Sequence, residues 1–392
     1  MENFRFVMVC FDEFFTDIFL DLTLPSLLAE GNLPYFAKHY PTTIEILTDK
    51  NGKEKLDAHP LTDVLKRSVK VDYVLIDTNI SVHKYASLSF WQNITIRKVQ
   101  HSGESLGFLI PDGVWSNNCF VQIVDALSSG KKAFLWAPLR AAHDSLTPIF
   151  KDGYRLPDGS IDISGRDLAT LGLQNLNGIT KATIWGEKHS VGHSGQLLWP
   201  IDEHQYIFRS FYFTPIVISS RAKISEIPAF DSPNLNNAGF HSTFGDMYPV
   251  ICVDNLEDVA TPTDSDEFMH FEVSKNMDAK GPQKKIRDFV LWTEKQAADI
   301  HVDLFDIVFK LHSRDWTCDL KTYPGSHEII QAVRKSRITS TLGLLFNDRQ
   351  AFLNRAAYYR VREKYLPSKG RRRNLLDQLI LEHIAPRIQR ES

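Results

Sequence analysis

Asp49, Asp77 and Asp112 each come directly after an apolar run in the first third of the chain. In open α/β proteins, ligands collect at the carboxyl edge of the sheet, where strand ends deliver such side chains. Hard divalent cations such as Mg²⁺ and Mn²⁺ take oxygen ligands from one or two carboxylates together with phosphate oxygens. We therefore treat these three aspartates as candidate ligands for a diphosphate and its cation.

Asp112 is the leading candidate for an active-site acid and for a metal ligand. The alternative is structural, because Pro111-Asp112-Gly113 also suits a tight turn in which each residue type is favoured. Asp49 and Asp77 have an alternative as well. Each could only cap a following helix, which is worth about 1 kcal/mol.

A second acidic group, Thr263-Asp264-Ser265-Asp266-Glu267, precedes a predicted strand. In an extended segment, Asp264 and Asp266 point to the same side and could share one metal ion. A solvated acidic loop explains the same residues. Both interpretations remain open on the sequence alone.

Three basic residues outside these acids are further candidates. His189 and His193 have the i, i+4 spacing of metal-binding helices. The neighbouring Gly192 and Ser194 favour a loop, and the glutamate expected of a metalloprotease is missing. Arg140 follows an apolar run and could bind phosphate as a fork-shaped donor, or form only a surface ion pair.

The elements that would position these residues alternate between strand-like and helix-like patterns over residues 1–140. This alternation predicts an α/β fold with a mostly parallel sheet and helices on both faces. The sequence contains no Gly-x-Gly-x-x-Gly after the first strand and no Gly-x-x-x-x-Gly-Lys-Ser/Thr. A dinucleotide dehydrogenase and a P-loop nucleotide hydrolase are therefore not expected.

Later parts of the chain have different patterns. Residues 150–270 contain frequent turn formers between short strand-like pieces, which predicts a smaller mixed or antiparallel sheet. From about residue 284 the spacing predicts helices over 286–311, 352–365 and 375–388. We therefore expect three parts: a ligand-binding α/β half at 1–145, a second half with mixed strands at 146–278, and a helical basic region at 279–392.

Composition indicates an ordinary soluble globular protein, with 43% hydrophobic and 24% charged residues. The four cysteines have no pairing or metal-type spacing, which fits a reducing cytoplasm. No apolar run reaches the roughly 18 residues of a membrane span. Residues 280–392 carry 22 Lys and Arg against 13 Asp and Glu, so we expect a cytoplasmic protein with a basic C-terminal region.

Three stretches resemble the nucleotide-sugar-dependent glycosyltransferases of the GT-A fold, of the bacterial surface-polysaccharide type. They are Leu24-Pro-Ser-Leu-Leu-Ala-Glu-Gly-Asn-Leu-Pro34, Leu47-Thr-Asp49 and Phe108-Leu-Ile-Pro-Asp112. The resemblance covers roughly residues 5–140 and extends more weakly to 275. It implies a GT-A-like, Rossmann-like sheet flanked by helices, a smaller mixed-sheet acceptor region and a helical C-terminal extension.

The resemblance also implies an activity: transfer of a hexosyl or related sugar from a nucleotide-diphosphate donor to a glycan or lipid-linked hydroxyl. Such transfer would serve capsule, lipopolysaccharide or O-antigen synthesis. Asp49 would hold the nucleotide base, with Asp77 and Arg140 also on the donor. The catalytic candidates are Asp112, Asp264, Asp266 and Glu267, and the last three are candidate bases. His189, His193 and His241 are weaker candidates for that base.

One departure from the family pattern affects the metal. Positions 110 and 114 are Ile and Val, so Asp112 has no second aspartate two residues away. Either acids from elsewhere complete a Mn²⁺ or Mg²⁺ site with Asp112, or Arg140 and other basic groups neutralise the diphosphate without a metal.

The basic C-terminal region suggests further partners. It fits peripheral attachment to the anionic inner face of a membrane, and helices at a homodimer interface or packed on the body explain it equally well. No nucleic-acid partner is expected. Two other functions remain as alternatives: a non-catalytic sugar- or nucleotide-binding protein on the same fold, and a metal-dependent hydrolase that uses Asp112 and the 189–193 loop.

Overall fold

The computed structural model describes residues 2–76, 84–188, 195–227, 252–253, 255–278, 281–290, 299–320 and 325–334. Four predicted site residues lie outside these ranges: Asp77, His189, His193 and His241. The predicted helices at 352–365 and 375–388 lie outside them as well.

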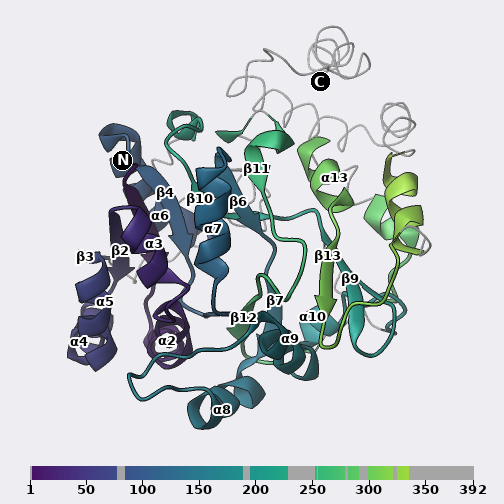
Figure 1. The fold of residues 1–392 in the computed structure, drawn as a ribbon, viewed down its shortest axis with the longest axis horizontal. Coiled ribbons are helices and arrows are strands. Elements are labelled where there is room, and N and C mark those ends of the chain that lie inside the picture. The colour runs from purple at the N-terminus through teal and green to yellow at the C-terminus, as the bar shows by residue number, and fades with distance from the viewer. Residues whose placement is uncertain are drawn as a thin grey trace, which may run out of the picture.

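A seven-stranded sheet forms the body of the protein, in the order β11-β6-β10-β4-β1-β2-β3 (Figure 1). Its strands are β1 (Phe4–Val9), β2 (Thr42–Thr48), β3 (Lys70–Leu75), β4 (Ser105–Leu109), β6 (Ala133–Trp136), β10 (Thr214–Ile218) and β11 (Val259–Ala260). Only β10 runs antiparallel to its neighbours within this sheet. The predicted α/β fold with a large, mostly parallel sheet is therefore confirmed.

The inner strand β1 presents apolar side chains on both of its faces. Phe4, Phe6 and Met8 point into the larger core cluster, whereas Val7 and Val9 point into a second cluster on the opposite face. Side chains alternate between faces along a strand. A parallel strand that is covered on both faces therefore has a mostly apolar sequence, which Arg5 alone interrupts in β1.

Helices cover both faces of this sheet. They are α1 (Glu13–Ile18), α2 (Leu24–Leu27), α3 (Leu33–His39), α4 (Lys50–Ala58), α5 (Pro60–Ser68), α6 (Lys84–Ser102) and α7 (Cys119–Ser128), with a π-helical turn η1 (Phe19–Thr23) between α1 and α2. Helices α3 and α7 cover one side (Figure 1), where Phe36 of α3 packs edge to face against both Phe6 and Phe120. Ile96 and Val99 of α6 belong to the cluster on the other side.

Two three-stranded sheets extend the body. One has the order β5-β12-β7, from Gly113–Trp115, His270–Ser274 and Leu139–Ala142. The other has the order β13-β9-β8, from Phe309–His312, Gln205–Ser210 and Gln196–Pro200. Around them lie α8 (His143–Gly153), α9 (Gly165–Gln174), α10 (Gly178–Lys181) and α13 (Asp299–Asp306), and short 3₁₀ turns at Ile224–Glu226 and Leu256–Asp258. The first small sheet is mixed and the second antiparallel. The predicted small sheet at 150–270 contributes β8, β9 and the start of β12, whereas β5, β7 and β13 come from outside that range.

The predicted helix over 286–311 is wrong at its C-terminal end. Helix α13 ends at Asp306, and β13 begins at Phe309 and pairs antiparallel with β9. Phe309 and Leu311 are both buried in the larger core, and Lys310 between them is not. This two-residue alternation belongs to a strand, and the apolar residues before it extended the helical pattern too far.

A buried ion-pair network joins three strands of the large sheet to α6. Arg5 pairs with Glu45, Asp72 and Glu104 at 2.9–3.4 Å. Glu45 is only 1% exposed, and its carboxylate also accepts hydrogen bonds from the side chains of Thr95 at 2.6 Å and Lys98 at 2.7 Å. The charge of Glu45 is thus fully neutralised inside the sheet-to-helix contact.

In the part of the chain that the structure describes, no helix is both long and apolar enough to span a membrane.

Replacing Glu45 with alanine should destabilise the fold by about 3 kcal/mol, because the change leaves partly buried cations without their common carboxylate. The matched control is Glu54→Ala, since Glu54 forms an exposed ion pair with Lys50 on α4 and should contribute less than about 0.5 kcal/mol. Urea unfolding measures both. Equal losses in the two variants would show that the network does not stabilise the sheet.

Candidate functional site

The aspartates that follow β1, β2 and β4 lie at one edge of the large sheet. These three strands are adjacent and parallel, so their carboxyl ends meet. The pKa of the Cys10 thiol is raised to about 12, mainly because the thiol is buried and also because three negative charges lie nearby. The charges come from Asp112, Asp12 and Asp49. The structure thus brings Asp49 and Asp112 together around the end of β1.

Asp12 is a member of this group that we did not single out from the sequence. Its backbone has φ 66° and ψ 160°, a conformation that is nearly restricted to glycine and costs of order 1–3 kcal/mol. Hydrogen bonds hold it there, because its carboxylate accepts from the Phe15 amide at 3.1 Å and its carbonyl accepts from the Thr16 hydroxyl at 2.7 Å. Asp12 follows an apolar run just as Asp49 does, so the same sequence signal could have identified it.

Asp49 caps helix α4. Its carboxylate accepts a hydrogen bond from the Gly52 amide at 2.7 Å. Helix capping is the structural alternative to ligand binding that the sequence left open for Asp49. The adjacent Thr48 is fully buried, and its hydroxyl has no partner among the described residues. A Cβ atom at position 52 would lie 2.3 Å from that hydroxyl oxygen. The end of β2 therefore packs closely against the first turn of α4.

Asp112 lies in the turn between β4 and β5. The Asp112 carbonyl accepts from the Val273 amide at 2.6 Å, and the Pro111 carbonyl accepts from the Thr23 hydroxyl at 2.7 Å. These two hydrogen bonds attach the β4–β5 turn to η1 through Thr23 and to β12 through Val273. Asp112 therefore occupies the predicted tight turn and also lies at the predicted edge of the sheet.

His270 of β12 lies directly behind this turn. Its ring stacks on Trp115 with centroids 4.0 Å apart, and its Nε2 lies where a side chain at Gly113 would be. Both ring nitrogens are buried and have no partner among the described residues. Burial lowers the pKa of His270 to about 3, so the ring is neutral near pH 7.

Arg140, expected to meet phosphate, is part of β7. Its Nε donates to Glu272 of β12 at 2.8 Å. The ion-pair alternative weighed for Arg140 is therefore present in the structure.

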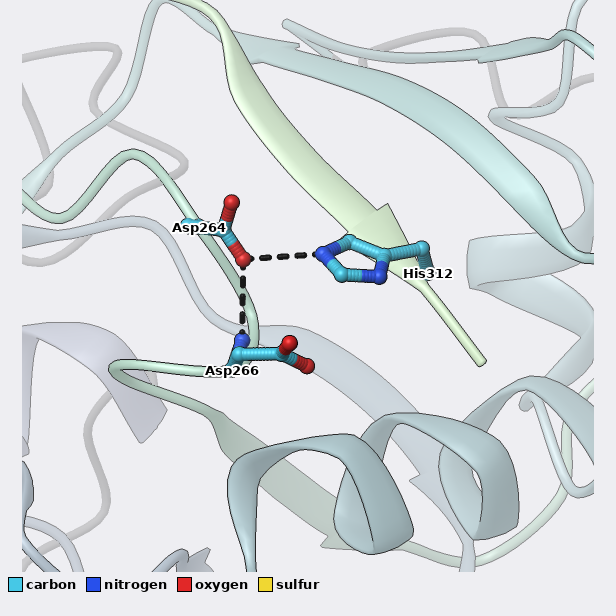
Figure 2. A group of neighbouring side chains, drawn as sticks. All are labelled: Asp264, Asp266 and His312. Atoms are coloured by element: carbon cyan, nitrogen blue, oxygen red, sulfur yellow. Dashed lines mark hydrogen bonds and ion pairs between the residues drawn. The ribbon is translucent and has the colours of Figure 1, made fainter. Parts of the chain in front are cut away.

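The second acidic group forms a turn and not the extended segment that we expected. The Asp266 amide donates to the Asp264 carboxylate at 3.0 Å, which closes the chain around Ser265 (Figure 2). The two carboxylates still lie close together. The turn brings them there, and not the alternation of side chains along an extended strand that we expected. The residue that completes the group is His312, whose Nε2 lies 2.8 Å from Asp264 Oδ1.

Strand β13 positions His312. Residue 264 forms a parallel bridge to Lys310, with the Lys310 amide donating to the Thr263 carbonyl at 2.8 Å and the Ser265 amide donating to the Lys310 carbonyl at 2.9 Å. The acidic turn is therefore attached to the edge of β13. Sequence reasoning missed His312 because it placed the preceding residues in a helix, and only the alternation at 309–312 indicates a strand.

Arg166, in the first turn of α9, also pairs with this group. Its guanidinium contacts Asp266 through Nε at 3.0 Å and through Nη2, and it also pairs with Asp315. Gly165 allows this approach, because a Cβ there would lie 2.1 Å from the Ser265 carbonyl oxygen. Helix α9 thus starts in backbone contact with the acidic turn.

Hydrogen bonds set the charge state of the Asp264–His312 pair. Burial favours a raised pKa for Asp264, but the hydrogen bonds from His312 and from the Asp266 amide outweigh it and lower the pKa to about 2. Burial also disfavours the charged His312, whereas its bonds to Asp264 and to the Arg314 carbonyl raise its pKa. Asp264 is therefore ionised near neutral pH, and its contact with His312 favours the protonated form of that imidazole.

Asp264, Asp266 and His312 are the one group of three such side chains, among the described residues, that could hold a metal ion. Their ligand atoms lie within 4.8 Å of one another. Two carboxylates and an imidazole suit cations such as Mn²⁺ or Zn²⁺. Asp112 is not in such a group within those residues, so the metal-binding role assigned to it remains a prediction.

Strand β12 connects the two acidic regions. The turn at 264–267 directly precedes it, and its residue Val273 bonds to Asp112 near the other end. Five residues of strand span roughly 15 Å, at about 3.3 Å per residue. The molecule therefore presents two acidic regions at opposite ends of β12: the sheet edge with Asp12, Asp49 and Asp112, and the acidic turn with His312.

No protein-family model and no curated protein matches the sequence. Among solved structures, TarS from S. aureus aligns over 93% of this chain and 49% of its own, with 8% identity and a TM-score of 0.32. Mouse xyloside xylosyltransferase 1 aligns over 41% and 63%, with 10% identity and a TM-score of 0.25.

A Bacillus anthracis protein described as a glucose-1-phosphate thymidylyltransferase, solved with sucrose, aligns over 37% of this chain and 57% of its own, with 13% identity and a TM-score of 0.23. In all three cases the match spans less than two thirds of the neighbour's length. These TM-scores are low, so function has to be inferred from the residues of this chain.

Replacing Gly165 with alanine should lower the free energy of unfolding by about 1–3 kcal/mol, because the new methyl group overlaps the acidic turn. Gly153→Ala at the end of α8 is the control, since a Cβ there meets no atom within 4 Å, and it should be neutral or slightly stabilising. Urea unfolding compares the two. A Gly165→Ala protein as stable as Gly153→Ala would contradict the close packing.

Acid should destabilise the protein partly through His270. Its pKa is about 3 when folded and about 6.5 when unfolded. Below pH 6.5 the unfolded chain therefore binds a proton that the folded chain does not, and stability falls as the pH falls. Between pH 8 and pH 5 the loss from this residue should be about 2 kcal/mol.

Urea unfolding at both pH values tests this, in the wild type, in His270→Asn and in a His39→Asn control at an exposed site. The His270 variant should lose about 2 kcal/mol less than the wild type between the two pH values. The control should behave like the wild type. An unchanged pH dependence in His270→Asn would show that the ring is not held neutral.

Proposed function

We propose that the protein is a glycosyltransferase that moves a sugar from a nucleotide-diphosphate donor to a hydroxyl acceptor. The observation that carries this proposal is the meeting of Asp12, Asp49 and Asp112 at the carboxyl edge of three adjacent parallel strands. Ligands of open α/β sheets bind at that edge. The similarity of the stretches ending at Asp49 and Asp112 to nucleotide-sugar-dependent transferases adds the substrate class.

The donor would lie along the direction of β12. A nucleotide-diphosphate sugar is an extended molecule whose base and sugar occupy opposite ends. In this arrangement Asp49 and Asp12 face the nucleoside, Asp112 lies between, and the acidic turn receives the sugar end. A divalent cation, when bound, would supply positive charge for the leaving diphosphate, and the residues that fit one are Asp264, Asp266 and His312.

The transfer breaks the bond between the anomeric carbon and the diphosphate oxygen and forms one to the acceptor oxygen, whose proton passes to a base. Asp264 is poorly suited as this base, because a pKa of about 2 makes its carboxylate a weak proton acceptor. Asp266 is occupied by Arg166. Glu267 is exposed, and its side chain has no hydrogen bond or ion pair within the described residues, so it is our candidate base.

The resemblance also supplies the finer part of the proposal: an acceptor that is a glycan or a lipid-linked hydroxyl in surface-polysaccharide synthesis. Attachment to an anionic membrane surface through the basic residues of 280–392 would bring the enzyme to such an acceptor.

A panel of nucleotides and nucleotide sugars tests the donor class by thermal shift, with and without Mn²⁺. A nucleoside diphosphate at 100 times its dissociation constant should stabilise the protein by about 2.7 kcal/mol. Asp49→Asn should weaken that binding at least tenfold, because a carboxylate that accepts from the base is lost. Asp57→Asn is the control, since Asp57 is an ion-paired carboxylate between α4 and α5.

Turnover of the stabilising donor, followed by release of free nucleoside diphosphate, then tests transfer. Glu267→Gln should bind the donor normally and lose at least a hundredfold in rate. No stabilisation by any nucleotide would overturn the proposal. Binding without release in the wild type would instead indicate a non-catalytic binding protein.

A further inference from the structure

We propose that the ammonium group of Lys275 binds the diphosphate of the donor and offsets the charge that the diphosphate gains when it leaves. Because this role presupposes the sugar transfer proposed above, it rests on the proposed function. Lys275 follows β12 at the end away from the acidic turn, so it can bind the diphosphate whether or not a cation occupies that turn.

The backbone at Lys275 is held in place by a buried side chain. Asn177 is fully buried, and its Nδ2 donates to the Lys275 carbonyl at 2.8 Å and to the Ser274 hydroxyl at 3.2 Å. The side chain of the next residue, Asn276, accepts a hydrogen bond from the Gly178 amide at 3.0 Å. The start of α10 therefore fixes the chain on both sides of Lys275, although the lysine side chain itself is exposed.

An aromatic ring positions the ammonium group. Lys275 Nζ lies 4.8 Å from the centre of the Phe14 ring, which is a cation–π contact. Phe14 belongs to α1 and packs against the larger core, and the ring of His143 lies 5.3 Å from it. Strands β7 and β12 lie side by side and run parallel (Figure 1). His143 and Lys275 thus follow two neighbouring strand ends that meet at Phe14.

This contact places the ammonium group at the edge of the sheet where the donor would bind. Lys275 is two residues, at most about 7 Å, beyond Val273, whose amide donates to the Asp112 carbonyl. The Phe14 ring is two residues beyond Asp12. The lysine side chain therefore starts near Asp112 and ends near Asp12, which is where the diphosphate follows the nucleoside in the proposed arrangement.

Other cations on the neighbouring elements already have carboxylate partners. Arg140 of β7 pairs with Glu272, and Lys151 of α8 pairs with Asp21. The Lys275 amine forms no ion pair within the described part of the chain, where its contact is the Phe14 ring. A diphosphate can therefore bind Lys275 without displacing a carboxylate, whereas Arg140, the sequence candidate for this role, would have to leave Glu272.

The charges at this edge explain why a cation is needed there. The three aspartates of the sheet edge place negative charge beside the donor site, and nearby like charges disfavour a further anion. When the bond to the anomeric carbon breaks, its electron pair stays on the diphosphate oxygen. The Lys275 ammonium offsets that charge electrostatically and keeps its own proton, while the proton of the acceptor hydroxyl passes to Glu267.

Calorimetric titration of the full-length protein in EDTA tests this contact, with inorganic pyrophosphate, UDP, GDP, CDP and ADP as probes. Lys275→Gln should weaken the binding of pyrophosphate, and of each nucleotide that binds the wild type, by about tenfold, because a charge-assisted contact is lost. Lys275→Arg keeps the charge and should stay within about threefold of the wild type. The control is Lys38→Gln at an exposed lysine of α3, which should bind like the wild type.

Phe14→Leu tests the ring separately from the charge. It keeps an apolar side chain against the core and should weaken pyrophosphate binding by about threefold, because the ammonium loses its aromatic partner; circular dichroism checks its fold. If the wild type binds neither pyrophosphate nor any of the four nucleotides, the proposed function fails together with the role of Lys275. If Lys275→Gln binds them as tightly as the wild type, or if Lys38→Gln loses as much, only the role of Lys275 is overturned.

Discussion

The two-sided burial of β1 is the constraint on which the rest of the structure depends. Because Phe6 and Val7 face opposite cores, a shift of one residue in register would move each apolar side chain to the wrong face. The pairing of β1 with β2 and β4 is therefore fixed. Once it is fixed, the ends of these strands meet at one edge, and the acids after them meet there too.

This constraint explains how much of the site could be predicted from sequence. Strands β1, β2 and β4 are mostly apolar, and Asp49 and Asp112 follow from where their apolar residues stop. Asp12 has the same signal, but its strained backbone is held by bonds to the next turn that no pattern of residue types displays. The sequence predicts which strands end at this edge. It does not predict the backbone conformation there, because local hydrogen bonds determine it.

The acidic turn depends on contacts of another kind. Asp264 and His312 are 48 residues apart in sequence, and they meet only because β13 pairs with β9 and binds the turn through residue 264. Single-sequence periodicity cannot report such pairing, and it misplaced β13 in a helix. The two neighbouring aspartates could be identified from spacing, whereas the histidine that completes the group could not.

The two acidic regions also differ in what their electrostatics allow. A carboxylate suited to accept a proton needs a pKa near the working pH, and the donors around Asp264 move its pKa to about 2. The same donors keep it ionised and oriented, which is what a ligand for a cation or a hydrogen-bond partner for a histidine requires. Asp264 therefore fits binding and positioning better than proton transfer, which is why the proposed base is the exposed Glu267.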